Sequence, residues 1–264
     1  MNSQKTVFGT KEWSVASVNC VIGCSHNCRY CYARYNATAR FHRMAPHQWP
    51  IMLVRSVDVR KKQRQYPGTV MFPTTHDITP EVMEPCVIVL RSLLEAGNTV
   101  LLVSKPHFSC IASLCWDFGK YEGQLLFRFT IGADDDRLLR YWEPGASNYQ
   151  ERLSSLRLAY RKGFRTSVSI EPMLDSPNIF RHVTNLSPFV TDSIWIGKLN
   201  NIRSRVRAET DEDRTAIKRI EDGQTNERIF EIYNSLKDFP LIRWKDSVKK
   251  IVGIQAMSEP GRDE

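Results

Sequence analysis

Four of the seven cysteines in this 264-residue chain lie between Cys20 and Cys31, and three of them follow the spacing C-x3-C-x2-C at Cys24, Cys28 and Cys31. Thiolates are soft ligands that select iron–sulfur clusters or zinc, and this close spacing lets one loop present several of them to one metal site. Three ligands are too few to close a tetrahedral structural zinc site. They are the right number for a [4Fe-4S] cluster that keeps one iron open to chemistry, which the spacing therefore predicts.

Two other uses of these cysteines remain open at this point. A structural zinc site would need a fourth ligand, which Cys20 or His26 could supply, although no second C-x2-C pair follows later in the chain. Inert thiols are the other alternative. The three remaining cysteines are each embedded among apolar residues, as small buried thiols often are, namely Cys86, Cys110 and Cys115.

The cysteine motif resembles the signature of the radical S-adenosylmethionine (SAM) superfamily, which has an aromatic residue, here Tyr30, before the third cysteine. A longer string resembles the branch that includes spore photoproduct lyase and the so-called DNA repair photolyases: Gly23-Cys24-x-His26-x-Cys28-x-Tyr30-Cys31-Tyr32-Ala33-Arg34. The resemblance implies a [4Fe-4S] cluster and SAM as cofactors and a one-electron donor such as flavodoxin or ferredoxin. It also implies reductive cleavage of SAM to a 5′-deoxyadenosyl radical, which abstracts a hydrogen atom from a substrate carbon.

The chain carries 37 Lys and Arg against 29 Asp and Glu, a net charge of +8. The excess is concentrated in residues 55–64 and 203–207 and favours an anionic partner, with nucleic acid or a nucleotide as the leading substrate class. A peptide or small metabolite is the alternative substrate, and solvated surface is the alternative explanation of the charge. A non-catalytic iron–sulfur or zinc protein that binds nucleic acid is the alternative of another class.

Neither a signal-peptide-like apolar segment nor an apolar run near the ~20 residues needed to span a bilayer is present. We therefore expect a cytoplasmic protein without membrane contact, in a compartment that keeps thiols reduced.

Short apolar runs alternate with amphipathic stretches along the chain, which indicates repeated βα units and a parallel sheet. We expect strands at residues 14–21, 69–72, 98–104, 125–131, 165–170 and 193–197, and a further closing strand at 249–254. Helices are expected at 32–44, 80–96, 148–162 and 224–236, whereas 208–222 could be a solvent-facing helix or a mobile insertion. The resemblance implies a partial (β/α)6 TIM-like barrel. We expect a single domain, with its barrel core at about 13–200 and a C-terminal extension at about 201–264.

Active sites of such barrels lie at the carboxyl ends of the strands. By the resemblance, the turn at Thr74 and Thr75 binds the methionine amino group through its backbone. Lys105 and Arg152 lie near the cofactor carboxylate. The remaining positions assigned to cofactor binding are Tyr30, Thr130 near the ribose, Glu171 at the ribose or the substrate, and the strand at Trp195 near the adenine.

Simpler interpretations exist for two of these positions. An ion pair between Glu143 and Arg152 would explain both residues, and Asp77 or Thr79 would serve as an ordinary helix N-cap after the Thr74 turn.

The chain departs from the branch in one respect. Spore photoproduct lyases have a cysteine near the end of the second strand that returns a hydrogen atom to the product radical, and residues 71–75 contain none. Cys110 and Cys115 are predicted to lie on an outer helix. The sequence therefore argues against thymine-dimer repair and identifies no catalytic hydrogen donor.

Overall fold

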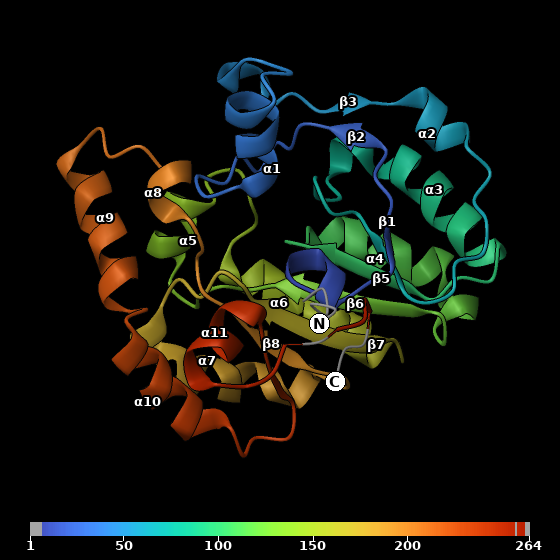
Figure 1. Cartoon of the computed structure of the whole chain (residues 1–264). Coiled ribbons are helices and arrows are strands. Elements are labelled where there is room, and N and C mark those ends of the chain that lie inside the picture. The colour runs from blue at the N-terminus through green and yellow to red at the C-terminus, as the bar shows by residue number, and fades with distance from the viewer. Residues whose placement is uncertain (1–6, 257, 262–264) are drawn as a thin grey trace, which may run out of the picture.

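The computed structural model describes residues 7–256 and 258–261. Seven parallel strands form the central sheet in the order β1-β4-β5-β6-β7-β8-β9 (Figure 1). Their bounds are β1 Ala16–Ser17, β4 Val70–Phe72, β5 Val100–Ser104, β6 Leu125–Thr130, β7 Arg165–Ile170, β8 Ile194–Ile196 and β9 Ile242–Trp244. Strands β2 (Val21–Ile22) and β3 (Leu53–Val54) form a separate antiparallel pair.

Alternate residues of each strand point to opposite faces of the sheet, and helices cover one of these two faces. Phe72, Leu102 and Phe127 pack in the outer core with apolar residues of the covering helices. The long helices that contribute to this core are α3 Met83–Glu95, α4 Phe108–Asp117, α6 Tyr149–Arg161, α7 Ile179–Leu186, α10 Asn226–Leu236 and α11 Asp246–Val252.

The other face of the sheet lines the inside of the barrel. There Met71, Leu101, Leu126 and Trp195 pack around Trp13, which comes from the segment before β1. The rings of Trp13 and Trp195 meet edge to face with their centroids 5.7 Å apart. This fills the interior with side chains, as in other barrels of this size.

The other α-helices are α1 Tyr32–Tyr35, α2 Ser56–Arg60, α5 Asp136–Trp142, α8 Ile202–Arg205 and α9 Asp211–Asp222. The remaining turns are the π-helix η2 Asn36–Arg40 and the 3-10 helices η1 Gly9–Glu12, η3 Pro46–Gln48, η4 Pro80–Val82, η5 Gly119–Tyr121, η6 Ser176–Asn178 and η7 Ser187–Phe189. No helix in the described part of the chain is both long and apolar enough to cross a membrane.

The predicted partial TIM-like barrel of parallel strands is confirmed, with three differences in its elements. The sheet has a seventh strand, β9, which comes from the segment predicted as an extension. The predicted strand at residues 249–254 is wrong because most of it lies in α11, and a short apolar run does not distinguish a strand from a buried helix. The predicted first strand at 14–21 is divided between β1 and β2.

Two of the predicted helices also take a more definite form. The helix expected at 32–44 is the short α1 followed by η2, and residues 208–222 contain the regular helix α9.

The sheet does not close by strand pairing, and the segment before β1 connects its two edges. Lys245, just after β9, donates through its Nζ to the carbonyl of Gly9 at 2.8 Å. The backbone N–H of Asp246 donates to the Glu12 carboxylate at 3.1 Å. Residues 9–13 thereby join the first strand to the last.

Candidate active site

The cysteine loop is held by a close approach of two backbone segments. Gly23 has a φ of +90°, and a Cβ there would lie 2.2 Å from the carbonyl oxygen of Ile51. The N–H of the next residue, Cys24, donates to the carbonyl of Trp49 at 2.9 Å. Only glycine fits this position, since it combines a left-handed φ with the absence of a side chain.

The predicted cluster ligand Cys24 lies beside Lys105, since its thiol and the Lys105 Nζ are each 3.8 Å from the same Asp77 carboxylate oxygen. Cys24 and Cys28 are buried and Cys31 is half-buried. Burial raises the pKa of each thiol, that of Cys24 to about 12. The positive charge of Lys105 favours the thiolates and so partly offsets this rise. The loop therefore brings its three thiols to the carboxyl end of β5, where Lys105 follows the strand.

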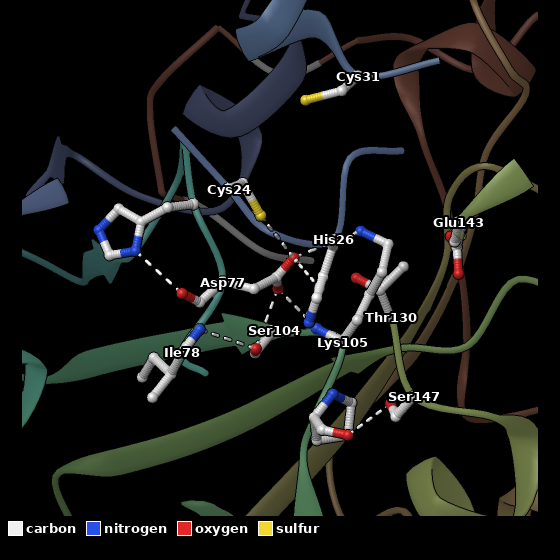
Figure 2. A network of polar contacts seen from close by, with 12 residues as sticks. Cys24, His26, Cys31, Asp77, Ile78, Ser104, Lys105, Thr130, Glu143 and Ser147 are labelled. Carbon is white, nitrogen blue, oxygen red and sulfur yellow. Dashed lines mark hydrogen bonds and ion pairs between the residues drawn. The ribbon is translucent and has the colours of Figure 1, made fainter. Parts of the chain in front are cut away.

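Asp77 forms the centre of a polar network beside these thiols (Figure 2). Its carboxylate is 2.8 Å from His26 Nδ1 and accepts from the Ser104 hydroxyl at 3.0 Å and the Lys105 backbone N–H at 2.7 Å. The Lys105 Nζ is 3.8 Å away, and the thiol of Cys24 donates at 3.8 Å. Burial alone would raise the pKa of Asp77, but Lys105 and His26 outweigh it and hold that pKa well below its usual range.

The sequence pattern indicated only a helix N-cap role for Asp77, and the structure does not bear that role out. Thr79 precedes η4 and makes no side-chain cap bond, and Asp77 points to β5 instead. The signal available was topological: carboxyl ends of neighbouring parallel strands share one edge, so a residue after β4 can reach Lys105 after β5.

A second buried network joins Tyr30, Glu143 and Arg152. The Tyr30 hydroxyl donates to Glu143, and Arg152 Nη1 lies 2.6 Å from the other carboxylate oxygen. Burial opposes ionisation of Glu143, but Arg152, Lys105 and Tyr30 together lower its pKa. The ion pair that was the simpler interpretation of Arg152 is therefore present.

Arg152 also fixes the backbone around this network. It donates through Nε to the carbonyl of Ser147 at 2.9 Å and through Nη1 to that of Thr130 at 3.3 Å. Its buried Nη2 has no hydrogen-bond partner among the described residues. The Nη2 group of the guanidinium can therefore still donate to a ligand. Contact between Arg152 and the cofactor stays a prediction.

The Thr74 turn is fixed by Asn19, a residue just before the cysteine loop. Asn19 Oδ1 accepts from the backbone N–H groups of Thr74 at 2.7 Å and Thr75 at 2.9 Å. The Tyr32 hydroxyl donates to the Thr74 carbonyl. Because both of these N–H groups are occupied, the backbone at Thr74 and Thr75 offers a ligand only carbonyl oxygens, which are the acceptors that binding of an amino group requires.

Two further predicted site residues belong to neighbouring strands: Glu171 directly follows β7, and Trp195 lies within β8. Glu171 Oε2 is 3.7 Å from the Nζ of Lys245, and burial raises the pKa of this carboxyl. The Trp195 side chain points into the barrel and is 1% exposed. Any contact at the adenine would therefore come from the backbone of this strand.

The structure thus separates the predicted site residues into two groups. Those near the thiols are Tyr30, Lys105, Thr130 and Arg152, with Thr74 and Thr75 linked to the cysteine loop through Asn19 and Tyr32. Glu171 belongs to the second group, which gathers around Lys245. Arg205 of α8 acts electrostatically on Cys31 and on Glu171 and so lies between the groups.

A different metal arrangement also exists within the first group. One ligand atom each of Cys24, His26 and Asp77 lie within 4.8 Å of one another. However, the Asp77 oxygen that lies near Cys24 and His26, Oδ2, is also 3.8 Å from the Lys105 ammonium, whose positive charge would oppose a metal ion at this position. The three-thiol set fits an iron–sulfur cluster better, because soft ligands favour iron–sulfur chemistry and a mixed set with a carboxylate does not.

No family model matches the chain. Among curated proteins, it is 25% identical over 177 residues to an uncharacterized protein, ORF301, of Acidianus two-tailed virus. This alignment covers 62% of the chain, which spans 58% of the length of that relative.

Two solved structures resemble the whole fold. A mutant spore photoproduct lyase with bound AdoMet and dinucleoside spore photoproduct aligns over 92% of this chain and 79% of its own, with a TM-score of 0.55 and 13% identity. Streptococcus suis SuiB bound to S-adenosylmethionine aligns over 91% of this chain and 52% of its own, with a TM-score of 0.53 and 8% identity. The chain therefore has the fold of the radical SAM superfamily, as its cysteine motif predicted.

Proposed function

We propose that the chain is a radical SAM enzyme whose Cys24, Cys28 and Cys31 hold a [4Fe-4S] cluster. The observation that carries the proposal is the position of the cysteine loop at the carboxyl ends of the strands, where the Cys24 thiol and the Lys105 Nζ each lie 3.8 Å from the same Asp77 carboxylate oxygen. When bound and reduced, the cluster would supply the electron that cleaves SAM to methionine and a 5′-deoxyadenosyl radical, which takes a hydrogen atom from a substrate carbon.

The residues around the thiols would bind and orient the cofactor. Asp77 restrains both the backbone and the ammonium group of Lys105. The second network restrains Tyr30, whose ring centroid lies 6.0 Å from the Lys105 Nζ. A buried ammonium is a favourable partner for the SAM carboxylate, because a charge out of water gains most from a fixed counter-charge. Acceptor groups at the Thr74 turn would receive the methionine amino group.

The remaining predicted contacts complete the site in this proposal. Thr130 and Glu171 would bind the ribose, and the strand at Trp195 would meet the adenine through backbone groups. Tryptophans inside the barrel exclude water beneath this region, which would protect a radical from side reactions.

Nucleic acid or a nucleotide is the substrate class that we favour. The net charge of +8 supports it, and the solved structure of similar fold with a bound dinucleoside photoproduct provides an analogy. A peptide or small metabolite is the alternative. A one-electron donor of the flavodoxin or ferredoxin class and a cytoplasmic location remain part of the proposal.

The test is anaerobic reconstitution with iron and sulfide, followed by dithionite and SAM. Wild-type protein should bind close to four iron atoms per chain and release 5′-deoxyadenosine. Cys24→Ala, Cys28→Ala and Cys31→Ala should each lose the cluster and the product. The matched control is Cys115→Ala, since Cys115 is a buried thiol of α4 far from the loop. Equal product from wild type and Cys28→Ala would refute the proposal.

A non-catalytic zinc protein is the second candidate, favoured by the close approach of Cys24, His26 and Asp77. In that case metal analysis would give zinc rather than iron, and His26→Ala would lose the metal. Under the radical SAM proposal, the same variant should retain its iron, because His26 supports Asp77 and is not a ligand.

A further inference from the structure

An exposed apolar surface lies on the segments that adjoin the cysteine loop, namely the end of β2, β3 with the residues before it, and α2. Four exposed aliphatic side chains form what we call the apolar face: Ile22, Ile51, Leu53 and Val57. Val57 is 78% exposed and Leu53 is 53% exposed. Ile22 and Leu53 are register partners, so they project from the same side of the β2–β3 pair. Contiguous exposed apolar side chains of this kind mark interaction surfaces.

The apolar face is connected to the cysteine loop through backbone contacts. The Cys24 N–H binds the Trp49 carbonyl at 2.9 Å, and the Arg55 N–H binds the Cys20 carbonyl at 2.8 Å. Gly23 packs against the carbonyl of Ile51, itself part of the face. A single layer of backbone therefore separates a partner on this face from the loop that carries the Cys24 thiol.

Basic side chains border the apolar face along one side. Residues 55–64 carry five of them and one acidic residue, Asp58, which pairs with Arg55 at 2.6 Å. Three of these cations are exposed and form no ion pair with any residue in the described ranges, namely Arg60, Lys61 and Lys62. The border is thus positively charged and unneutralised, which complements a negatively charged protein surface.

We propose that the apolar face and its basic border are the docking surface for an acidic one-electron donor protein. This inference rests on the proposed function, which requires an external electron. On docking, one electron passes from the reduced donor to the cluster held by the cysteine loop, so the donor is oxidised and the cluster reduced by one electron each. The apolar centre supplies contact area, and the basic border steers the approach and fixes its orientation.

The side chains on this surface favour a protein over a nucleic acid. Single-stranded nucleic acid is bound by aromatic side chains that stack on bases, whereas all four members of the apolar face are aliphatic. Aliphatic side chains surrounded by a charged rim are instead typical of protein interfaces.

The experiment compares two reductants in the same enzyme. The rate of 5′-deoxyadenosine formation is measured with reduced flavodoxin and, separately, with dithionite, which needs no docking surface. The variants are Leu53→Asp with Val57→Asp, and Lys61→Glu with Lys62→Glu. The matched control is Phe180→Asp, which places the same charge at an exposed apolar position of α7, 58% exposed and outside this surface.

We expect either double variant to need at least about tenfold more flavodoxin for half-maximal rate, equivalent to about 1.4 kcal/mol. Its rate with dithionite should stay that of the wild type, and Phe180→Asp should change neither rate. Titration calorimetry of flavodoxin against protein lacking the cluster should show the same loss of affinity. Salt should weaken wild-type binding more than that of the Lys61→Glu, Lys62→Glu variant.

Several outcomes would overturn the inference. One is an unchanged flavodoxin requirement in both double variants. Another is a double variant that weakens binding of a short oligonucleotide but not of flavodoxin, which would assign the surface to nucleic acid. A wild-type dimer that Leu53→Asp with Val57→Asp converts to monomer would assign it to a second copy of the chain. If dithionite gives no product even in wild type, the proposed function fails, whereas the calorimetric result still decides whether the donor docks here.

Discussion

Two lysines that follow strands of the sheet have different surroundings. Lys105, after β5, is half-buried, and its ammonium lies 3.8 Å from the Asp77 carboxylate, which the Cys24 thiol also contacts. Lys245, after β9, is fully buried and contacts the Glu12 carboxylate, with the Glu171 carboxylate at 3.7 Å and the centroid of the Trp13 ring at 4.1 Å. The first lysine lies beside the cysteine loop, the second between carboxylates and indoles.

The paired carboxylates differ in the same way. Asp77 accepts hydrogen bonds from His26, Ser104 and Lys105, and its pKa is held well below its usual range despite burial. For Glu12 burial dominates, and its pKa is raised to about 7 although Lys245 acts in the opposite direction. Enough hydrogen-bond donors keep a buried carboxylate ionised. We infer that the Lys105 side is arranged for a ligand and the Lys245 side for closure of the barrel.

The largest effect on stability should come from breaking the closure. Lys245→Met leaves the buried Glu12 carboxylate with only the more distant ammonium of Lys249, 3.9 Å away, and should cost about 3–5 kcal/mol of unfolding free energy, measured by urea denaturation. Glu12→Gln combined with Lys245→Met should recover much of that loss. A single variant as stable as wild type would contradict the role of this pair.

The pH dependence of stability should separate the two carboxylates. Because the pKa of Glu12 rises from 4.5 to about 7 on folding, the folded state binds more protons in that window, so stability falls as pH increases through it. The resulting loss of unfolding free energy should approach about 3 kcal/mol and should be absent in Glu12→Gln. Asp77 has a lowered pKa, so its contribution is present above pH 3.8 and is lost as pH falls below that value.

Removal of the other ammonium should affect ligand binding more than folding. In Lys105→Met, Asp77 keeps His26, Ser104 and a backbone N–H, so stability should fall by only about 1–2 kcal/mol. SAM affinity of the reconstituted protein should fall at least about tenfold, or 1.4 kcal/mol. Unfolding as severe as that of Lys245→Met, with SAM affinity unchanged in the folded fraction, would reverse the comparison.

The smallest effect is expected at the fourth cysteine of the motif region. Cys20 is fully buried with its sulfur 3.9 Å from that of Cys86, and it belongs to the core rather than the thiol group around Lys105. Cys20→Ala should cost about 1 kcal/mol in stability and leave the iron content of reconstituted protein unchanged. Loss of iron would show that Cys20 belongs to the site.

The parts of this molecule that follow from local pattern were predictable. Continuous apolar runs at β5 and β6 identified strands, and cysteine spacing identified the loop and the superfamily fold. The resemblance placed Lys105 near the carboxylate of the cofactor, and the structure places the Asp77 carboxylate 3.8 Å from its Nζ.

Features that depend on contacts between distant segments were not predictable in this way. The partnership of Asp77 with Lys105 requires knowing that β4 and β5 are neighbours. Strand β9 has Arg243 between its two apolar residues, so it lacks the continuous apolar run that identified the equally short β4 and β8. Glu12 and Lys245 lie at opposite ends of the chain, and nothing local in either segment indicates that they meet.

The connection between residues 9–13 and the segment after β9 has a consequence for biosynthesis. The Lys245–Gly9 and Asp246–Glu12 hydrogen bonds join residues 236 and 234 positions apart. Contacts of such long sequence separation form late, because the entropy of closing the loop must be lost before they stabilise anything. During translation Gly9 and Glu12 lack these two partners until the segment after β9 has left the ribosome, although Trp13 can pack against Met71 and Leu101 earlier. The nascent barrel should therefore stay open along one side, and in this interval the tryptophans of its interior would need protection from aggregation.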